Sequence, residues 1–408
     1  MNSVIYFDNN ATTCLAPEAL EAMRPYLADL YGNPSSIHSF GSQVAKKIQE
    51  AREQVAALLG ASDPVEIVFT SCGTEGDNAA IRGLLESQPD KRHIVTTQVE
   101  HPAVLGLCQH LEKKGYRVTW LGVDEEGTLD LDELRDSLTD DTALASIMYA
   151  NNETGVIFPV EQIGEIVKSR GIPFHVDAVQ VAGKISLNVK NGPIDLLTIS
   201  AHKFHGPKGI GALYIRKGIT FRPLLVGGHQ ERNRRGGTEN VAGIVGMGKA
   251  AELALKHMGE DAERVRGLRD LLERSLLDSC PGSRVNGHRK KRIANTLNVS
   301  FEFLEGEAIL VLLDQYGICA STGSACTAGS VEPSHVLRAM KVPANWIQGA
   351  VRFSLSRYNN RDEVRLVSGK MPLIVQRLRD LSTLGRLGDR QEAQPGPYRP
   401  AERVGARR

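Results

Sequence analysis

Several features that mark other protein classes are missing from this sequence of 408 residues. It has no run approaching the 18 apolar residues that a membrane helix requires, and 49 Lys and Arg residues are balanced by 48 Asp and Glu residues. Nucleic-acid-binding proteins usually carry a basic excess, which a net charge of +1 does not show. No basic residue precedes Arg24, so a secretory signal is not expected. We expect a cytoplasmic protein whose partners are neither membranes nor nucleic acids.

Cysteine is also scarce, with six residues in the chain and no C-x-x-C pair. Small secreted scaffolds are dense in disulfides, and structural zinc sites need closely spaced ligands. The nearest histidine pair, His202 and His205, flanks a lysine. The sequence therefore predicts free thiols and no metal bound within the monomer.

Nucleotide-binding loops are absent as well. No G-x-x-x-x-G-K-[ST] sequence occurs, and Gly206, Gly209 and Gly211 do not fit G-x-G-x-x-G. Nucleotides are therefore not the predicted ligand.

What the chain does contain is an alternation of short apolar segments and helix-like segments, which predicts an α/β protein with a mostly parallel seven-stranded sheet. The expected strands are Glu66–Thr70, His93–Thr97, Tyr116–Leu121, Ala143–Tyr149, Phe174–Asp177, Leu196–Ser200 and Gly211–Ile215. A long charged helix is expected over Ala242–Leu276. A second, smaller α+β unit is expected from Ile293–Val299, Ala308–Tyr316 and Val351–Leu355.

Two of these strands end in residues with complementary chemistry. Phe174–Asp177 ends in a carboxylate, and Leu196–Ser200 is followed closely by Lys203. Neighbouring parallel strands would bring both groups to one rim of the sheet, where ligands collect. A lysine can form a Schiff base with an aldehyde cofactor, and a carboxylate can keep a pyridine nitrogen protonated. Together they favour pyridoxal phosphate (PLP) chemistry, although each alone is more often a surface lysine or a capping aspartate.

Two further segments fit this interpretation less specifically. Between a strand and a helix, Gly73 would let the backbone approach a phosphate, and Thr74 fits a capping box with Asp77. Plain helix capping would explain the same residues. His101 could stack on a cofactor ring or move a proton, or be an ordinary loop histidine.

Cys326 lies in a run of small and hydroxyl-bearing residues, 321–330. Such a loop packs poorly and moves easily, which suits a reactive thiol. An inert cysteine in a linker is the alternative.

With these motifs in order, the sequence resembles the PLP-dependent cysteine desulfurases of the class V aminotransferase family, most closely the nitrogen-fixation (NifS) type. The likeness runs from Tyr6 to about Tyr358. It is carried by Tyr6–Thr13 (YFDNNATT), Gly32–Ser36, Thr70–Glu75 (TSCGTE), Glu100–Pro102, Asn151–Gly155 (NNETG), His175–Gln180, Ser200–Lys208, Arg235–Asn240 (RGGTEN) and Gly323–Thr327 (GSACT). Thr322 and Ala328 differ from the serines usual there, which are small changes.

The resemblance implies a role for each matching residue. Lys203 would carry the cofactor, Asp177 would pair with its pyridine nitrogen, Gln180 would bond its phenolic oxygen, and His101 would stack on the ring and transfer protons. The phosphate would be held by Gly73, Thr74, Ser200 and His202, with Thr238 contributed by the partner of a homodimer. Asn152 would lie near cofactor and substrate, Arg352 would bind the substrate carboxylate, and Cys326 would accept the sulfur.

The implied fold is PLP fold type I. The large PLP-binding domain would comprise residues 15–260, and the small domain residues 1–14 and 261–387 with a mobile cysteine loop at about 321–333. Residues 388–408, rich in Pro, Gly and Arg, are expected to be a disordered tail.

The implied reaction converts L-cysteine to L-alanine and leaves sulfur as a persulfide on Cys326. An iron–sulfur scaffold protein would accept this sulfur, for nitrogenase maturation, and the Cys326 persulfide would be the contact to a cluster on that partner. The alternatives are a housekeeping desulfurase, a selenocysteine lyase or aminotransferase of the same fold, and a non-catalytic thiol scaffold. The last would not need Lys203, Asp177 and a phosphate site together.

Overall fold

The seven expected strands form one sheet, in the order β2-β8-β7-β6-β5-β3-β4, in a computed structural model that describes residues 4–322 and 333–381. All neighbouring pairs are parallel except the two that involve β8, so the mostly parallel sheet is confirmed. The strands are β2 (Ile67–Thr70), β3 (His93–Thr97), β4 (Arg117–Leu121), β5 (Thr142–Ser146), β6 (Phe174–Asp177), β7 (Leu196–Ser200) and β8 (Gly211–Ile215).

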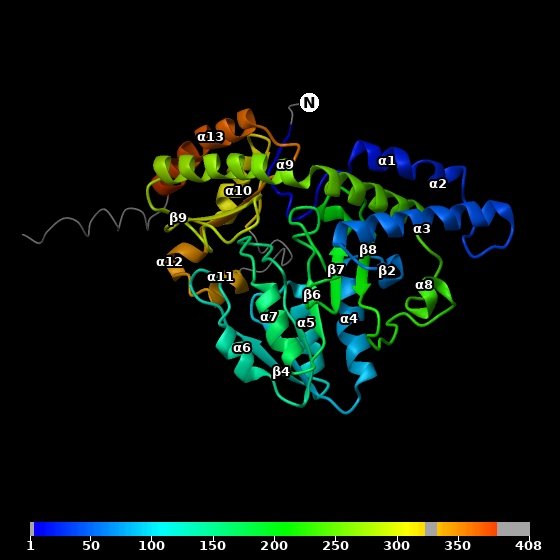
Figure 1. Cartoon of the computed structure of the whole chain (residues 1–408). Coiled ribbons are helices and arrows are strands. Elements are labelled where there is room, and N and C mark those ends of the chain that lie inside the picture. The colour runs from blue at the N-terminus through cyan, green and yellow to red at the C-terminus, as the bar shows by residue number, and fades with distance from the viewer. Residues whose placement is uncertain (1–3, 323–332, 382–408) are drawn as a thin grey trace, which may run out of the picture.

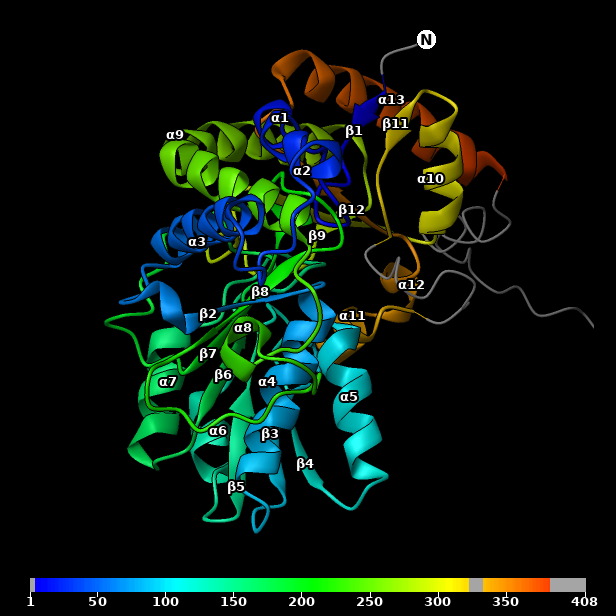
Figure 2. The same cartoon turned by 90° about the vertical axis from the view of Figure 1, so that its right-hand side faces the viewer.

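Alternate residues along the sheet strands enter different cores, because successive side chains point to opposite faces. Ile67 and Phe69 pack with Val95 on one face, whereas Val68 and Ile94 pack on the other. The first face is covered by α3 (Ser39–Leu59), α6 (Leu131–Ser137) and α7 (Val160–Ser169). The second is covered by α4 (Gly73–Ser87) and α5 (Pro102–Glu112), as Figures 1 and 2 show. Burial of both faces explains why the strands read as continuous apolar runs.

A third core lies in the smaller unit. Its main sheet has the order β12-β10-β9, and β1 (Ile5–Tyr6) pairs in parallel with β11 (Ile318–Cys319). The segment Ile293–Val299, which was expected in this unit, overlaps β10, and the strand itself begins at Thr296. The other elements are β9 (Ser283–Val285), β10 (Thr296–Phe301), β12 (Ala350–Ser354), α10 (Gly306–Asp314), α11 (His335–Ala339), α12 (Ala344–Ile347) and α13 (Arg361–Leu381).

The expected long helix is α9 (Val241–Ser279), and it serves both units. Its first half, including Ile244 and Ala254, packs on the large sheet, and its second half, from Val265 to Leu276, packs in the small core. Figure 1 shows α9 passing from α1 (Pro17–Met23) and α3 at one end to α13 at the other. We propose that the domain boundary, expected at residues 260 and 261, falls within this helix.

Short elements complete the description: α2 (Pro25–Ala28), α8 (Gln230–Asn233), and the 3-10 turns η1 (Pro64–Glu66) and η2 (Ala201–Lys203). No helix within the described ranges combines the length and apolar content needed to cross a membrane. The expected tail, residues 388–408, lies outside the described residues, as does most of the expected loop at 321–333.

Candidate active site

The carboxyl ends of β6 and β7 lie side by side, as their sequences predict. Asp177 ends β6 opposite Thr198 of β7, and Lys203 follows β7 in the turn η2. Both residues line a cavity of about 230 Å³ at this rim of the sheet. The other lining residues are Ala11, Cys72, Gly73, Thr74, Asp77, His101, Met148, Ala150, Asn152, Val179, Gln180, Ser200 and His202. The structure thus brings together nine of the residues expected at the cofactor.

The amine of Lys203 is held by the backbone of the N-terminal segment. Its Nζ donates to the carbonyl oxygens of Asn10, at 2.5 Å, and Ala11, at 2.9 Å. The same Asn10 carbonyl accepts a hydrogen bond from Gln180 Nε2 at 3.1 Å. In the sequence Asn10 stands out only as part of the motif Tyr6–Thr13, because nothing in its residue type shows that its backbone carbonyl meets two site residues.

Asp177 is buried, and burial raises the pKa of its carboxyl to about 6. A hydrogen bond from the Val179 backbone N–H at 2.9 Å and the nearby Lys203 charge oppose that rise. With this pKa the carboxyl is mostly ionised near neutral pH, and a cationic partner at the site would favour the carboxylate further.

His101 is the N-cap of α5, with Nδ1 accepting from the Ala103 N–H at 3.1 Å. Burial lowers the pKa of His101 to about 4, with further lowering from Lys203 and His335. A neutral ring whose Nδ1 accepts a bond carries its proton on Nε2. His202 is also neutral, because burial and Lys203 lower its pKa to about 4, and its Nδ1 lies 3.1 Å from Thr12 Oγ1.

The expected capping box of Thr74 with Asp77 is wrong. The helix begins at Gly73 with Cys72 as N-cap, whose side chain makes no capping bond. Glu75 instead accepts from the Ser71 N–H at 2.7 Å, and Asp77 is buried with its Oδ1 3.6 Å from His175 Nε2. The Thr74-x-x-Asp77 spacing fits a capping box, but the Asp77 side chain turns into the core and so cannot cap the helix. Burial there raises the pKa of Asp77 well above the usual range.

Three expected residues lie away from this cavity or outside the description. Thr238 lines a separate cavity of about 120 Å³ together with Arg235. Arg352 reaches the cofactor cavity through its neighbours: Nη1 donates to the Asn152 carbonyl at 3.0 Å, and Nη2 pairs with Asp8 Oδ1 at 2.7 Å. Cys326 lies outside the described residues.

Comparison with known proteins decides the family. The family described as Aminotransferase class-V matches residues 5–367. The chain belongs to the class V aminotransferase family.

Within this family the chain is similar to cysteine desulfurases. It is 63% identical to the cysteine desulfurase of Trichormus azollae, over 93% of this chain and 95% of the relative. It is 52% identical to the cysteine desulfurase NifS of Azotobacter vinelandii, over 93% of this chain and 94% of that protein. A solved structure titled NifS-like protein matches with a TM-score of 0.87 and 42% identity, covering 92% of this chain and all of the other.

Members of this family use PLP, and the cavity fits that group. Ser200 Oγ is buried in the cavity wall and meets no hydrogen-bond partner within the described part of the chain. The start of α4 lacks a side-chain cap, and a helix start of this kind binds phosphate. A Cβ added at Gly73 would come within 2.9 Å of the Val179 side chain. Only glycine therefore leaves space for a phosphate at the start of α4. Lys203 and Asp177 supply the amine and the carboxylate that the aldehyde and the pyridine nitrogen require.

The five described cysteines, Cys14, Cys72, Cys108, Cys280 and Cys319, are free. Across residues 4–322 and 333–381, no three His, Cys, Asp or Glu side chains are grouped so that they could hold a metal ion.

Proposed function

We infer that this chain is a PLP-dependent cysteine desulfurase that converts L-cysteine to L-alanine and takes the sulfur onto Cys326 as a persulfide. The observation that carries the proposal is the cavity in which Lys203, Asp177 and the uncapped start of α4 meet. The similarity to named cysteine desulfurases over more than nine tenths of the chain supplies the substrate.

When bound, PLP supplies an electron sink that stabilises negative charge at the substrate Cα. We assign its binding to Lys203 at the aldehyde, Asp177 at the pyridine nitrogen and Gln180 at the phenolic oxygen. We assign binding of the phosphate to Gly73, Thr74, Ser200 and His202. Thr238 lines a different cavity of its own chain, so we propose that it serves the phosphate of a partner subunit in a homodimer.

We assign proton transfer to Lys203 and His101, and binding of the substrate to Arg352. The Lys203 amine moves the Cα proton, because it lies at the cavity rim and can act as base and acid. His101, neutral with its proton on Nε2, would lie against the ring of bound PLP and could donate that proton. Arg352 is fixed by Asp8 and Asn152, and its remaining N–H groups bind the substrate carboxylate.

Sulfur transfer falls to Cys326. Its thiolate attacks the substrate sulfur, a new S–S bond forms, and the Cβ–S bond breaks with its electron pair going to the carbon skeleton. The skeleton takes up protons and leaves as alanine. We propose that the persulfide is then passed to an iron–sulfur scaffold protein in the cytoplasm, and the likeness to NifS favours nitrogenase maturation as the destination.

The test uses Cys326→Ala, with Cys14→Ala as the control because Cys14 is an exposed free thiol. We expect Cys326→Ala to keep the yellow cofactor and bind L-cysteine but to form no alanine catalytically. Intact mass without reductant should show one added sulfur on the wild type and on Cys14→Ala, which peptide mapping places on Cys326.

Wild-type alanine production by Cys326→Ala would contradict the assignment. A new keto acid in place of alanine would identify an aminotransferase. A strong preference for selenocysteine would identify a selenocysteine lyase.

A further inference from the structure

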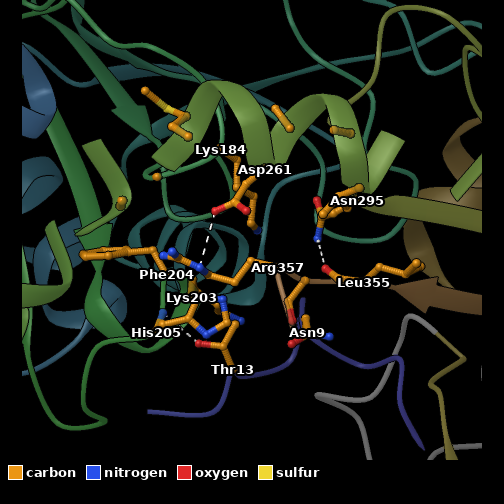
Figure 3. Close-up of a pocket in the computed structure, with 17 residues that line it drawn as sticks. Asn9, Thr13, Lys184, Lys203, Phe204, His205, Asp261, Asn295, Leu355 and Arg357 are labelled. Atoms are coloured by element: carbon orange, nitrogen blue, oxygen red, sulfur yellow. Dashed lines mark hydrogen bonds and ion pairs between the residues drawn. The ribbon is translucent and has the colours of Figure 1, made fainter. Parts of the chain in front are cut away.

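Lys184 has no role in the proposed reaction, yet it lies next to Lys203. It follows Gly183, whose φ of 74° turns the chain after β6. Lys184 and Lys203 line a second cavity of about 60 Å³, shown in Figure 3, between the large sheet, α9 and the segment after β12. Lys184 is half-buried, and an amine that is partly removed from water needs a hydrogen-bond partner to offset the cost.

The partner of Lys184 is a residue that we assign to the cofactor. Lys184 Nζ donates to Gln180 Oε1 at 3.3 Å, and Gln180 Nε2 donates to the Asn10 carbonyl at 3.1 Å. That carbonyl also accepts from Lys203 Nζ at 2.5 Å. One continuous set of hydrogen bonds therefore joins Lys184 to the lysine of the active site.

These contacts fix which end of the Gln180 amide faces which neighbour. The two ends of an amide are nearly equal in size, but one only accepts and the other only donates. The Gln180 Oε1 atom faces the Lys184 amine, and Nε2 faces the Asn10 carbonyl. A flipped amide would place donor against donor and acceptor against acceptor, so only this orientation makes both hydrogen bonds. Gln180 consequently offers an N–H, and not an oxygen, on the side of Asn10 and Lys203.

The charges around Lys184 leave its contact with Gln180 intact. Burial, together with the positive charges of Lys203 and Arg352, lowers the pKa of Lys184 to about 7. Asp261, which lines the same cavity, is engaged by Arg357 at 3.4 Å. An ammonium and a neutral amine can both donate one N–H to Gln180, so the amide keeps its orientation in either state.

We propose that Lys184 is a positioning residue for the cofactor, holding Gln180 so that its amide N–H meets the phenolic oxygen of PLP. The proposal rests on the proposed function for the place of the cofactor. It does not depend on sulfur transfer, since binding and absorbance of PLP can be measured without cysteine.

The experiment compares Lys184→Met, which keeps the length and volume of the side chain, with Lys184→Arg, which keeps a donor. In Lys184→Met we expect the Kd for PLP to rise about fivefold to tenfold, as for one lost hydrogen bond, and the absorbance maximum of the bound cofactor to shift. In Lys184→Arg, most of the wild-type affinity for PLP and most of the wild-type absorbance maximum should be kept. Lys190→Met, an exposed lysine on the same segment, is the matched control and should match the wild type.

A double-mutant cycle shows whether Lys184 acts through Gln180. In the Gln180→Leu background, Lys184→Met should change the Kd and the absorbance maximum no further. Additive effects, or an unchanged Kd and spectrum in Lys184→Met alone, would overturn the proposal while leaving the desulfurase assignment untouched. If Lys184→Met does not fold, Lys184→Ala enters the same cycle, because its shorter side chain only extends a cavity that already exists.

Discussion

His93 and His175 are buried in the large sheet, and each has both ring nitrogens within hydrogen-bond distance of hydroxyl oxygens. For His93 the partners are Thr142 at 2.8 Å and Thr119 at 2.9 Å. Burial, with a contribution from Arg117, lowers the pKa of His93 to about 4. Between that value and the unfolded value of about 6.5, the unfolded chain binds more protons than the folded chain. His93 therefore stabilises the fold above about pH 6.5, and this contribution falls as the pH falls towards 4.

We predict that His93→Gln reduces the loss of unfolding free energy between pH 7 and pH 4.5 by about 2 kcal/mol. Glutamine can still bond the threonines, but it takes up no proton. Urea denaturation at several pH values measures the slope, with His110→Gln on the exposed surface of α5 as the control. Parallel slopes for His93→Gln and the wild type would contradict the prediction.

At the scale of elements, Glu231 joins the segment that follows β8 to α3 and to β2. Glu231, in the short α8, has a φ of 46° and accepts from Arg52 of α3 at 2.6 and 2.8 Å. It also accepts from the Phe69 N–H of β2 at 3.2 Å. The Glu231 and Arg52 side chains are only 3% and 6% exposed, so neither charge has water as an alternative partner.

We predict that Glu231→Gln lowers the free energy of unfolding by about 3 to 5 kcal/mol, because Arg52 is left as an uncompensated buried charge. The control is Glu21→Gln, whose partner Arg24 is 68% exposed, and it should change stability by less than about 1 kcal/mol. If the two variants lost the same free energy of unfolding, burial of the Glu231–Arg52 pair would not be what makes Glu231→Gln destabilising. Chemical denaturation of both variants makes the comparison.

The sequence predicted every strand of the large sheet because those strands are continuous apolar runs bounded by turns. The sequence does not show where β10 begins, because the Ile293 N–H bonds the Gly155 carbonyl, a long-range contact that only the fold makes. In the site, Lys203 and Asp177 were predictable from strand ends. Asn10 and Lys184 were not, because their roles depend on a backbone carbonyl and on a partner side chain that only the fold brings together.

At the scale of the whole molecule, residues 5–13 connect the small core to the active-site lysine. Phe7 is fully buried in the small core, and three residues later the Asn10 carbonyl holds Lys203. Thr13 then bonds the His202 carbonyl through its N–H at 2.9 Å and its hydroxyl at 3.0 Å. The position of the amine is therefore linked to packing in the other unit.

We predict that Phe7→Ala weakens PLP binding as well as stability, whereas Phe301→Ala weakens stability alone. Both rings are fully buried in the same core, so each truncation should cost about 3 to 5 kcal/mol. Only Phe7 is covalently close to the carbonyls that hold Lys203. Titration of the folded apo-proteins with PLP separates the two effects, and equal affinities would contradict the link.

The pairing of Ile5 with Ile318 also has a consequence for synthesis on the ribosome. β1 is synthesised before β11, and all seven strands of the large sheet are made between the two. At about 5 to 20 residues per second, β1 waits roughly 15 to 60 s for β11. The large sheet can form in that time. Ile5 and Phe7 stay exposed, and accessible to chaperones, until the small core forms around them.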